Sequence, residues 1–168
     1  IDIETSACVT KCRQQGQSGI DLQFQKLVVK EKDMLELGEH TLHFYMASMV
    51  HWPEVMVTYE STERILFSAD AFGKFGALEV TADEEWACEA RRYYFNIVGK
   101  YGIAVQALLS KIKELKIQMI CPAHGPMLSA PLEEYVNLYD TWSRYEPETN
   151  GVLIAYGSFH GNTKAAAE

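Results

Sequence analysis

The spacing of the apolar residues changes near the middle of the chain, and this change constrains the fold more than any other feature. Between residues 27 and 68 the apolar residues alternate or form short runs that turn-forming residues separate. This pattern is typical of β-strands. From residue 82 to residue 115 they recur at helical spacing. Strands followed by helices predict an α/β fold of the α+β type.

The same pattern predicts where the strands and helices lie. The expected strands are residues 27–30, 34–37, 41–47, 55–59, 64–68, 117–121 and 152–156. The expected helices are residues 8–15, 82–101, 103–115 and 132–145, and residues 164–168 open another, alanine-rich helix. Within the second helix, the residues expected to form one core-facing side are Trp86, Tyr93, Tyr94, Ile97 and Tyr101.

Composition excludes several classes of partner. The chain has 168 residues, of which 48% are apolar and 23% charged, as in an ordinary globular protein with a buried core. Its net charge of −8 argues against nucleic acid or an anionic membrane surface as the main partner. No apolar run approaches the roughly 20 residues that a membrane-spanning helix needs.

The four cysteines show no CxxC pair, which argues against a thiolate zinc site. Cys8 and Cys12 are expected to be neighbours on a helix face, and Cys88 to lie in a helix. A disulfide framework does not suit so large and apolar a chain. We therefore expect reduced, structural thiols in a cytoplasmic protein.

Three ligand-type side chains follow apolar strands and precede sharp turns. They are His51 in MVHWPEVM, Asp70 in LFSADAFG and His124 in ICPAHGPM. Imidazole nitrogen and carboxylate oxygen suit zinc or iron, and one carboxylate can bridge two ions. Taken singly, a histidine near a turn is more often a hydrogen-bonded structural residue, and an aspartate there is usually a cap. The spacing alone leaves both interpretations open.

The stretch GVLIAYGSFHGNTKAAAE, residues 151–168, has the pattern of an anion site. An apolar strand leads through a loop of small and hydroxyl residues into a helix N-terminus, where backbone N–H groups and the helix dipole favour a phosphate. The polar segment YEPETNG, residues 145–151, is expected to link this stretch to the preceding part of the chain.

Four motifs in this order resemble a known family. HWPEVM, LFSADAFG, CPAHGPM and YGSFHGNT are similar to segments of the flavodiiron proteins, also called A-type flavoproteins. The resemblance implies a metallo-β-lactamase-like αββα sandwich with a two-iron site, followed by a flavodoxin-like domain that binds FMN. Residues 1–148 would then be the C-terminal portion of the first domain. Residues 149–168 would contain the first strand and phosphate loop of the second.

The resemblance assigns a role to each matching residue. His51 matches a ligand of the first iron, His124 a ligand of the second, and Asp70 the carboxylate that bridges them. The residues that match the loop around the FMN phosphate are Ser158, Gly161, Asn162 and Thr163. No residue beyond the metal ligands is expected to be catalytic.

This chain also departs from the family pattern. Glu54 stands where an aspartate is common, and Ala69 where an asparagine is. Leu128 replaces a tryptophan close to the irons, so we expect an altered pocket lining. The family's HxExDH motif is absent here, and the resemblance implies that it should precede Ile1. His40 and His43, in HTLH, do not replace it and are interpreted as surface or hairpin residues. We expect an internal part of a flavodiiron protein, with incomplete cofactor sites and no activity of its own.

The resemblance implies a function for the intact protein. Electrons would pass through FMN to the diiron centre and reduce dioxygen to water, nitric oxide to nitrous oxide, or both. The expected partners are an electron donor such as rubredoxin or a reductase, and a second copy in a head-to-tail homodimer. Two alternatives remain: a metal-dependent hydrolase of the metallo-β-lactamase fold, and a scaffold without catalysis.

Overall fold

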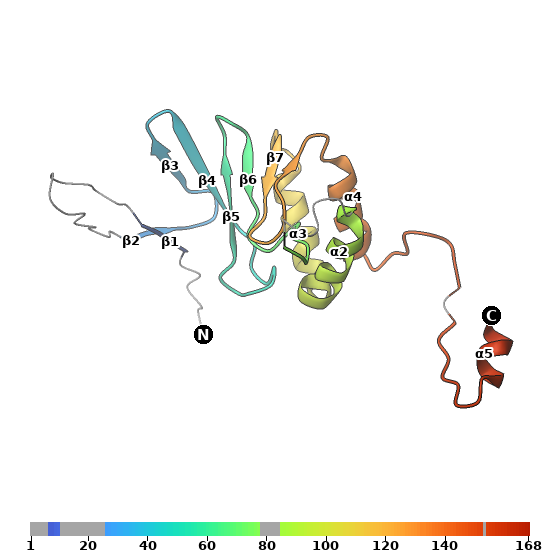
Figure 1. The fold of residues 1–168 in the computed structure, drawn as a ribbon. Coiled ribbons are helices and arrows are strands. Elements are labelled where there is room, and N and C mark those ends of the chain that lie inside the picture. The colour runs from blue at the N-terminus through green and yellow to red at the C-terminus, as the bar shows by residue number, and fades with distance from the viewer. Residues whose placement is uncertain (1–6, 11–25, 78–84, 153) are drawn as a thin grey trace, which may run out of the picture.

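The computed structural model describes residues 7–10, 26–77, 85–152 and 154–168. Its body is a twisted sheet with helices packed against one face, and the C-terminal tail extends away from this body (Figure 1). The α/β architecture predicted from the apolar spacing is thus confirmed.

The main sheet contains six strands in chain order. They are β3 (Met34–Leu37), β4 (His40–Met46), β5 (Met56–Glu60), β6 (Ile65–Phe67), β7 (Met119–Cys121) and β8 (Leu128–Ser129). All neighbours are antiparallel except β6 and β7, which are parallel because a helical crossover joins them. A separate antiparallel pair consists of β1 (Ala7–Thr10) and β2 (Lys26–Val29). Six of the seven predicted strands therefore exist, within one or two residues at most of their ends.

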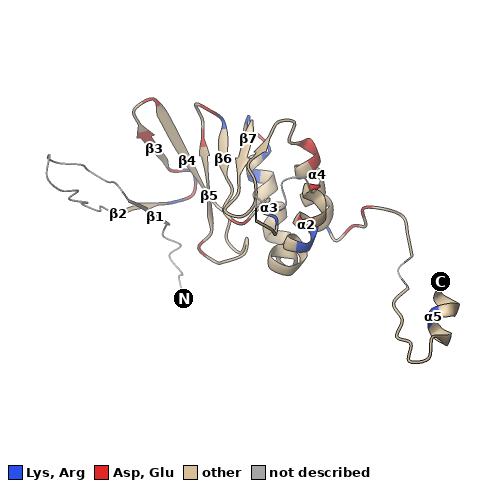
Figure 2. Cartoon of the chain, in the orientation of Figure 1, with Lys and Arg blue, Asp and Glu red and all other residues tan. Residues whose placement is uncertain are grey.

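The crossover between β6 and β7 is helical, but the type of helix changes along it. Its segments are α2 (Trp86–Tyr93), a π-helix (Tyr94–Val98), a 3₁₀ turn (Gly99–Tyr101) and α3 (Gly102–Ile112). Two further helices are α4 (Glu133–Ser143) and the short α5 (Asn162–Ala167). Glu133 and Glu134 occupy the first turn of α4 (Figure 2), where negative charge complements the helix dipole. In the described residues no helix has the length and apolarity needed to span a membrane.

Two predicted elements are wrong. Residues 8–10, expected to begin a helix, belong to β1, where Cys8 pairs with Val28, so Cys8 is not on a helix face. Strand pairing and the β-branched Val9 and Thr10 outweigh the helical spacing there. Residues 11–15, including Cys12, lie outside the described residues.

Residues 152–156 were expected to form a strand, but the described ones are irregular and exposed. A strand requires a neighbour to accept and donate its backbone hydrogen bonds, and this segment pairs with none of the six sheet strands.

The core lies between the sheet and the helices. Leu66 on β6 pairs with Ile120 on β7, and both are buried against α3. On the opposite face of the sheet, Ile65, Phe67 and Met119 remain partly exposed, as the two-residue period of a strand requires.

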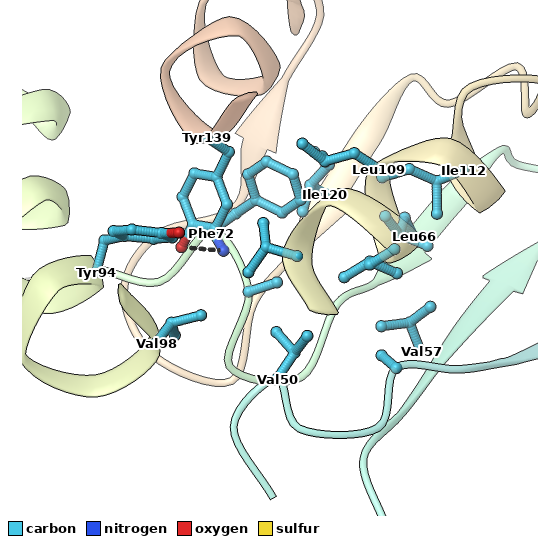
Figure 3. Close-up of a cluster of buried hydrophobic side chains, with 14 of the residues drawn as sticks. Val50, Val57, Leu66, Phe72, Tyr94, Val98, Leu109, Ile112, Ile120 and Tyr139 are labelled. Atoms are coloured by element: carbon cyan, nitrogen blue, oxygen red, sulfur yellow. Dashed lines mark hydrogen bonds between the residues drawn. The ribbon is translucent and has the colours of Figure 1, made fainter. Parts of the chain in front are cut away.

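An aromatic cluster connects the helices to the loop after β6 (Figure 3). The Phe72 backbone N–H donates to the Tyr139 hydroxyl over 2.6 Å, and the two rings stack with centroids 4.3 Å apart. Tyr94 lies edge-on to Tyr139 at 5.1 Å and 5.3 Å from Trp142. Burial raises the pKa of Tyr94 to about 12, so its ring and hydroxyl remain neutral in the core.

We predict that Tyr94→Ala destabilises the chain by about 3 kcal/mol, because Tyr94 is fully buried among three aromatic rings. Phe95→Ala is the matched control, since Phe95 is the next residue but is 52% exposed. Chemical denaturation should show a clearly smaller loss for the control. Equal losses in the two variants would contradict the assignment of Tyr94 to the core.

Candidate metal centre

His51, Asp70 and His124 lie at one edge of the main sheet. His51 is in the loop between β4 and β5, Asp70 follows β6, and His124 follows β7. Because β6 and β7 are parallel, their carboxyl ends meet at the same edge, and the β4–β5 connection is next to them. The sheet therefore brings together the three residues that sequence reasoning selected.

The Asp70 carboxylate lies between the two imidazoles. Its Oδ2 is 3.4 Å from His51 Nε2, and its Oδ1 is 3.4 Å from His124 Nε2. Each carboxylate oxygen thus faces a different histidine. This is the arrangement in which one carboxylate can bridge two ions while each histidine binds one of them.

The distance between each Asp70 oxygen and its neighbouring histidine nitrogen can be compared with the geometry of metal sites. Two ligand atoms that each lie about 2.1 Å from an ion, and are 3.4 Å apart, subtend about 108° at that ion, close to the tetrahedral angle. Either histidine–carboxylate pair could therefore hold an ion without moving. Over the ranges that the structure describes, no three His, Cys, Asp or Glu side chains converge on a single point. The residues thus fit two incomplete metal positions rather than one complete site.

A half-open pocket of about 590 Å³ surrounds the three side chains. Lys74, which is almost fully buried, lines it together with Phe75, Tyr93 and Ile97. The exposed Trp52 packs its ring 5.3 Å from that of His51. Apolar and aromatic walls around a few polar groups are typical of a small-molecule or metal site.

Backbone hydrogen bonds connect the loops that carry Asp70 and His124. Ala123 N–H donates to the Ala69 carbonyl over 2.7 Å, and Lys74 N–H donates to the His124 carbonyl over 3.3 Å. The relative position of these two candidate ligands is therefore set by main-chain contacts rather than by side chains alone.

Two residues beside the candidate ligands have left-handed backbone conformations. Met49 has φ of 68° and lies two residues before His51, while Ala69 has φ of 52° and directly precedes Asp70. Neither residue type favours this region, and such outliers gather at functional sites. The conformation also explains why an asparagine suits position 69, because its short polar side chain tolerates the left-handed region.

Tyr93 is a site residue that sequence reasoning assigned only to the core. It is buried as expected, but it also lines the pocket, with its ring 5.9 Å from that of His124. Burial, the negative charge of Asp70 and a hydrogen bond to that carboxylate all raise the pKa of Tyr93. No sequence signal separates it from Tyr94, because both are aromatic residues on one helical stretch.

Gly73 makes the position of Tyr93 possible. A Cβ at residue 73 would lie 3.0 Å from two ring atoms of Tyr93 and 3.1 Å from the His124 carbonyl oxygen. The absence of a side chain at Gly73 thus lets α2 approach the two loops closely.

The remaining predicted residues lie elsewhere. His40 is on β4, with Nδ1 3.2 Å from the Glu60 carboxylate, as expected of a hairpin residue. Leu128 pairs with Ile120, is buried in the core and does not line the pocket. That leucine in place of a tryptophan alters the pocket lining stays a prediction.

The candidate phosphate residues lie at the start of α5, away from the sheet (Figure 1). They are exposed: Ser158, Gly161, Asn162 and Thr163. Gly161 has φ of 83° and directly precedes the helix, so glycine is required by the backbone there.

Known proteins are similar to this chain in sequence and in fold. The model of a family described as ODP family beta lactamase matches residues 18–125. The chain belongs to this family. The coenzyme F420H2 oxidase of Methanothermobacter marburgensis is 32% identical over 150 residues, which cover 84% of this chain and 37% of that protein.

Two solved structures are similar to this ODP-family chain. The flavodiiron protein from Giardia intestinalis has a TM-score of 0.66 and 28% identity, covering 71% of this chain and 31% of that one. The rubredoxin oxygen:oxidoreductase from Desulfovibrio gigas has a TM-score of 0.65 and 30% identity, covering 72% and 32%. The chain thus spans about a third of the length of these relatives. The resemblance to flavodiiron proteins is confirmed, and the family is one of oxidoreductases with a β-lactamase-like fold.

We predict that Ala69→Asn stabilises the chain by up to about 1 kcal/mol, because asparagine adopts the left-handed region at lower cost than alanine. Ala69→Ser is the control, since serine is also small and polar but lacks this preference. Thermal and chemical denaturation measure the difference. A loss of stability in the asparagine variant would refute the role of backbone strain at residue 69.

We expect the chain to hold little or no iron and to bind added Zn²⁺ weakly. The described residues offer each ion only one imidazole nitrogen and one carboxylate oxygen, and tight sites need more fixed ligands. Calorimetric titration with Zn²⁺ should show affinity reduced at least about tenfold in Asp70→Asn. His40→Ala, a histidine outside the pocket, should bind like the wild type. Two tightly held irons per chain would contradict the ligand assignment.

Proposed function

We propose that the protein containing this chain is a flavodiiron oxidoreductase. In this proposal it reduces dioxygen to water, nitric oxide to nitrous oxide, or both, with electrons that pass through FMN to a diiron centre. The observation that carries the proposal is the Asp70 carboxylate, whose two oxygens each lie 3.4 Å from a different histidine.

The chain's own residues would hold the metals and shape their surroundings. His51 would bind the first iron, His124 the second, and Asp70 would bridge them. The neutral hydroxyl of Tyr93 would orient the Asp70 carboxylate by hydrogen bonding to it, since its raised pKa keeps its proton in place. Phe75 and Ile97 would limit access of water from one side of the pocket. When bound, the iron pair would supply the redox chemistry.

The tail would contribute to flavin binding. Ser158, Gly161, Asn162 and Thr163 combine hydroxyl and amide donors with the N-terminus of α5, a combination that suits a phosphate group. We propose that residues 149–168 begin a flavodoxin-like domain and that these four residues contact the FMN phosphate. Residues 1–148 would belong to the β-lactamase-like domain.

The partners are also part of the proposal. The Desulfovibrio gigas relative is a rubredoxin oxygen:oxidoreductase, which supports an electron donor of that kind. A head-to-tail homodimer would bring the flavin of one subunit to the irons of the other. Free thiols at Cys88 and Cys121 agree with a cytoplasmic location.

Asp70→Ala tests the proposal in the flavin- and iron-loaded protein that contains this chain. The flavin is reduced without oxygen and then mixed with dioxygen or nitric oxide in a stopped-flow instrument. We expect rapid flavin reoxidation in the wild type. The variant should lack this rapid phase, because removing the bridging carboxylate disrupts both metal positions. Elemental analysis should show the matching loss of iron.

Two results would overturn the proposal. One is undiminished iron content and flavin reoxidation in Asp70→Ala. The other is hydrolysis of an ester or lactone that depends on Asp70 without any reaction of reduced flavin. The latter outcome would instead support a metal-dependent hydrolase of the same fold.

A further inference from the structure

The residues that directly follow α4 still contact the body of the protein. Tyr145 N–H donates to the Trp142 carbonyl and Glu146 N–H to the Thr141 carbonyl, each over 3.1 Å. The Tyr145 hydroxyl also donates to the Gly99 carbonyl over 3.0 Å. These contacts fold the first residues of the predicted linker back against the helical crossover.

Glu148 makes the last contacts of this kind. Its carboxylate accepts two hydrogen bonds from Arg91 on α2, from Nε over 2.5 Å and from Nη2 over 2.7 Å. The Trp142 indole N–H on α4 donates to the same carboxylate over 2.7 Å. The Arg91 guanidinium carbon also lies 5.8 Å from the centre of the Trp142 ring.

These contacts differ from an ordinary surface ion pair, which contributes little to stability. The arginine–carboxylate pair is bidentate, and Trp142 beneath it is only 1% exposed. The side chains of Arg91 and Glu148 are both partly covered. The hydrogen bond from Arg91 holds the pKa of Glu148 below its usual value, so the carboxylate stays charged at neutral pH.

Beyond Glu148, the described residues show no hydrogen bond or ion pair with the body. Val152 is 90% exposed, and the described side-chain interactions of the tail join tail residues to each other: Tyr156 to Glu168 and Lys164 to Glu168. A Cβ at Gly151 would meet nothing within 4 Å, so this glycine supplies backbone freedom rather than room for a neighbour.

We propose that Arg91, Trp142 and Glu148 form a clasp that fixes residues 144–148 to α2 and α4 and makes residues 149–151 the pivot of the C-terminal segment. The polar linker predicted over residues 145–151 then consists of two parts. The first part is held by the body, and the Thr-Asn-Gly sequence that follows is free to rotate. The clasp thereby sets the point at which the following segment leaves the body, whatever that segment binds.

The clasp shares helix α2 with the candidate metal centre. Arg91 lies two residues before Tyr93 on α2, and Tyr93 lines the pocket. The same helix therefore carries the anchor of the tail and a residue beside Asp70.

Hydrogen–deuterium exchange in Glu148→Gln tests the clasp. The matched control is Glu146→Gln, because Glu146 belongs to the same linker and contributes only a backbone hydrogen bond among the described contacts. We expect exchange at the Tyr145 and Glu146 amides to rise about tenfold in Glu148→Gln and to remain unchanged in the control. Residues 149–151 should exchange rapidly in all variants, and residues 133–140 of α4 should stay protected.

Arg91→Lys provides a second, milder variant if Glu148→Gln loses protection throughout α4. Lysine keeps the charge but cannot form the bidentate pair, so exchange at the Tyr145 and Glu146 amides should rise selectively. Unchanged exchange at the Tyr145 and Glu146 amides in both variants would overturn the proposal. Protection of residues 149–151 equal to that of residues 145–146 in the wild type would do the same, because the pivot would then lie elsewhere.

Discussion

The parallel pairing of β6 and β7 is the interaction on which the rest of the structure depends. Phe67 pairs with Cys121, so the two strands end side by side and their loops leave the same edge of the sheet. The loop hydrogen bond from Ala123 to Ala69 continues this pairing beyond the strands. Because parallel strands need a long crossover, the pairing also accounts for the helices that bury the sheet face.

Much of this arrangement follows from local sequence. The hairpin between β5 and β6 follows from the turn residues 60–63, and the helical period after residue 85 predicts the crossover. The three candidate ligands could also be selected, because histidine or aspartate followed by a sharp turn at a strand end is a local pattern. Their convergence depends on strand order and register, which no local pattern specifies.

The features that sequence reasoning missed depend on contacts between distant residues. Cys8 to Thr10 form a strand because of their pairing with β2, and residues 152–156 form none because no described strand accompanies them. Tyr93 and Tyr94 look alike in sequence, yet one lines the pocket and the other fills the core. The π-helix begins between them, and its onset is set by packing that residue spacing does not encode.

Gly73 limits how this site can change over evolutionary time. A Cβ at this position would meet both the ring of Tyr93 and the His124 carbonyl oxygen, so any side chain there displaces two walls of the pocket at once. A lineage that altered this position would need compensating changes in both α2 and the loop after β7. By contrast, the exposed Trp52 can vary with little effect on the backbone. Substitutions at the rim can therefore change the pocket's outer surface without altering the spacing of Asp70 and His124.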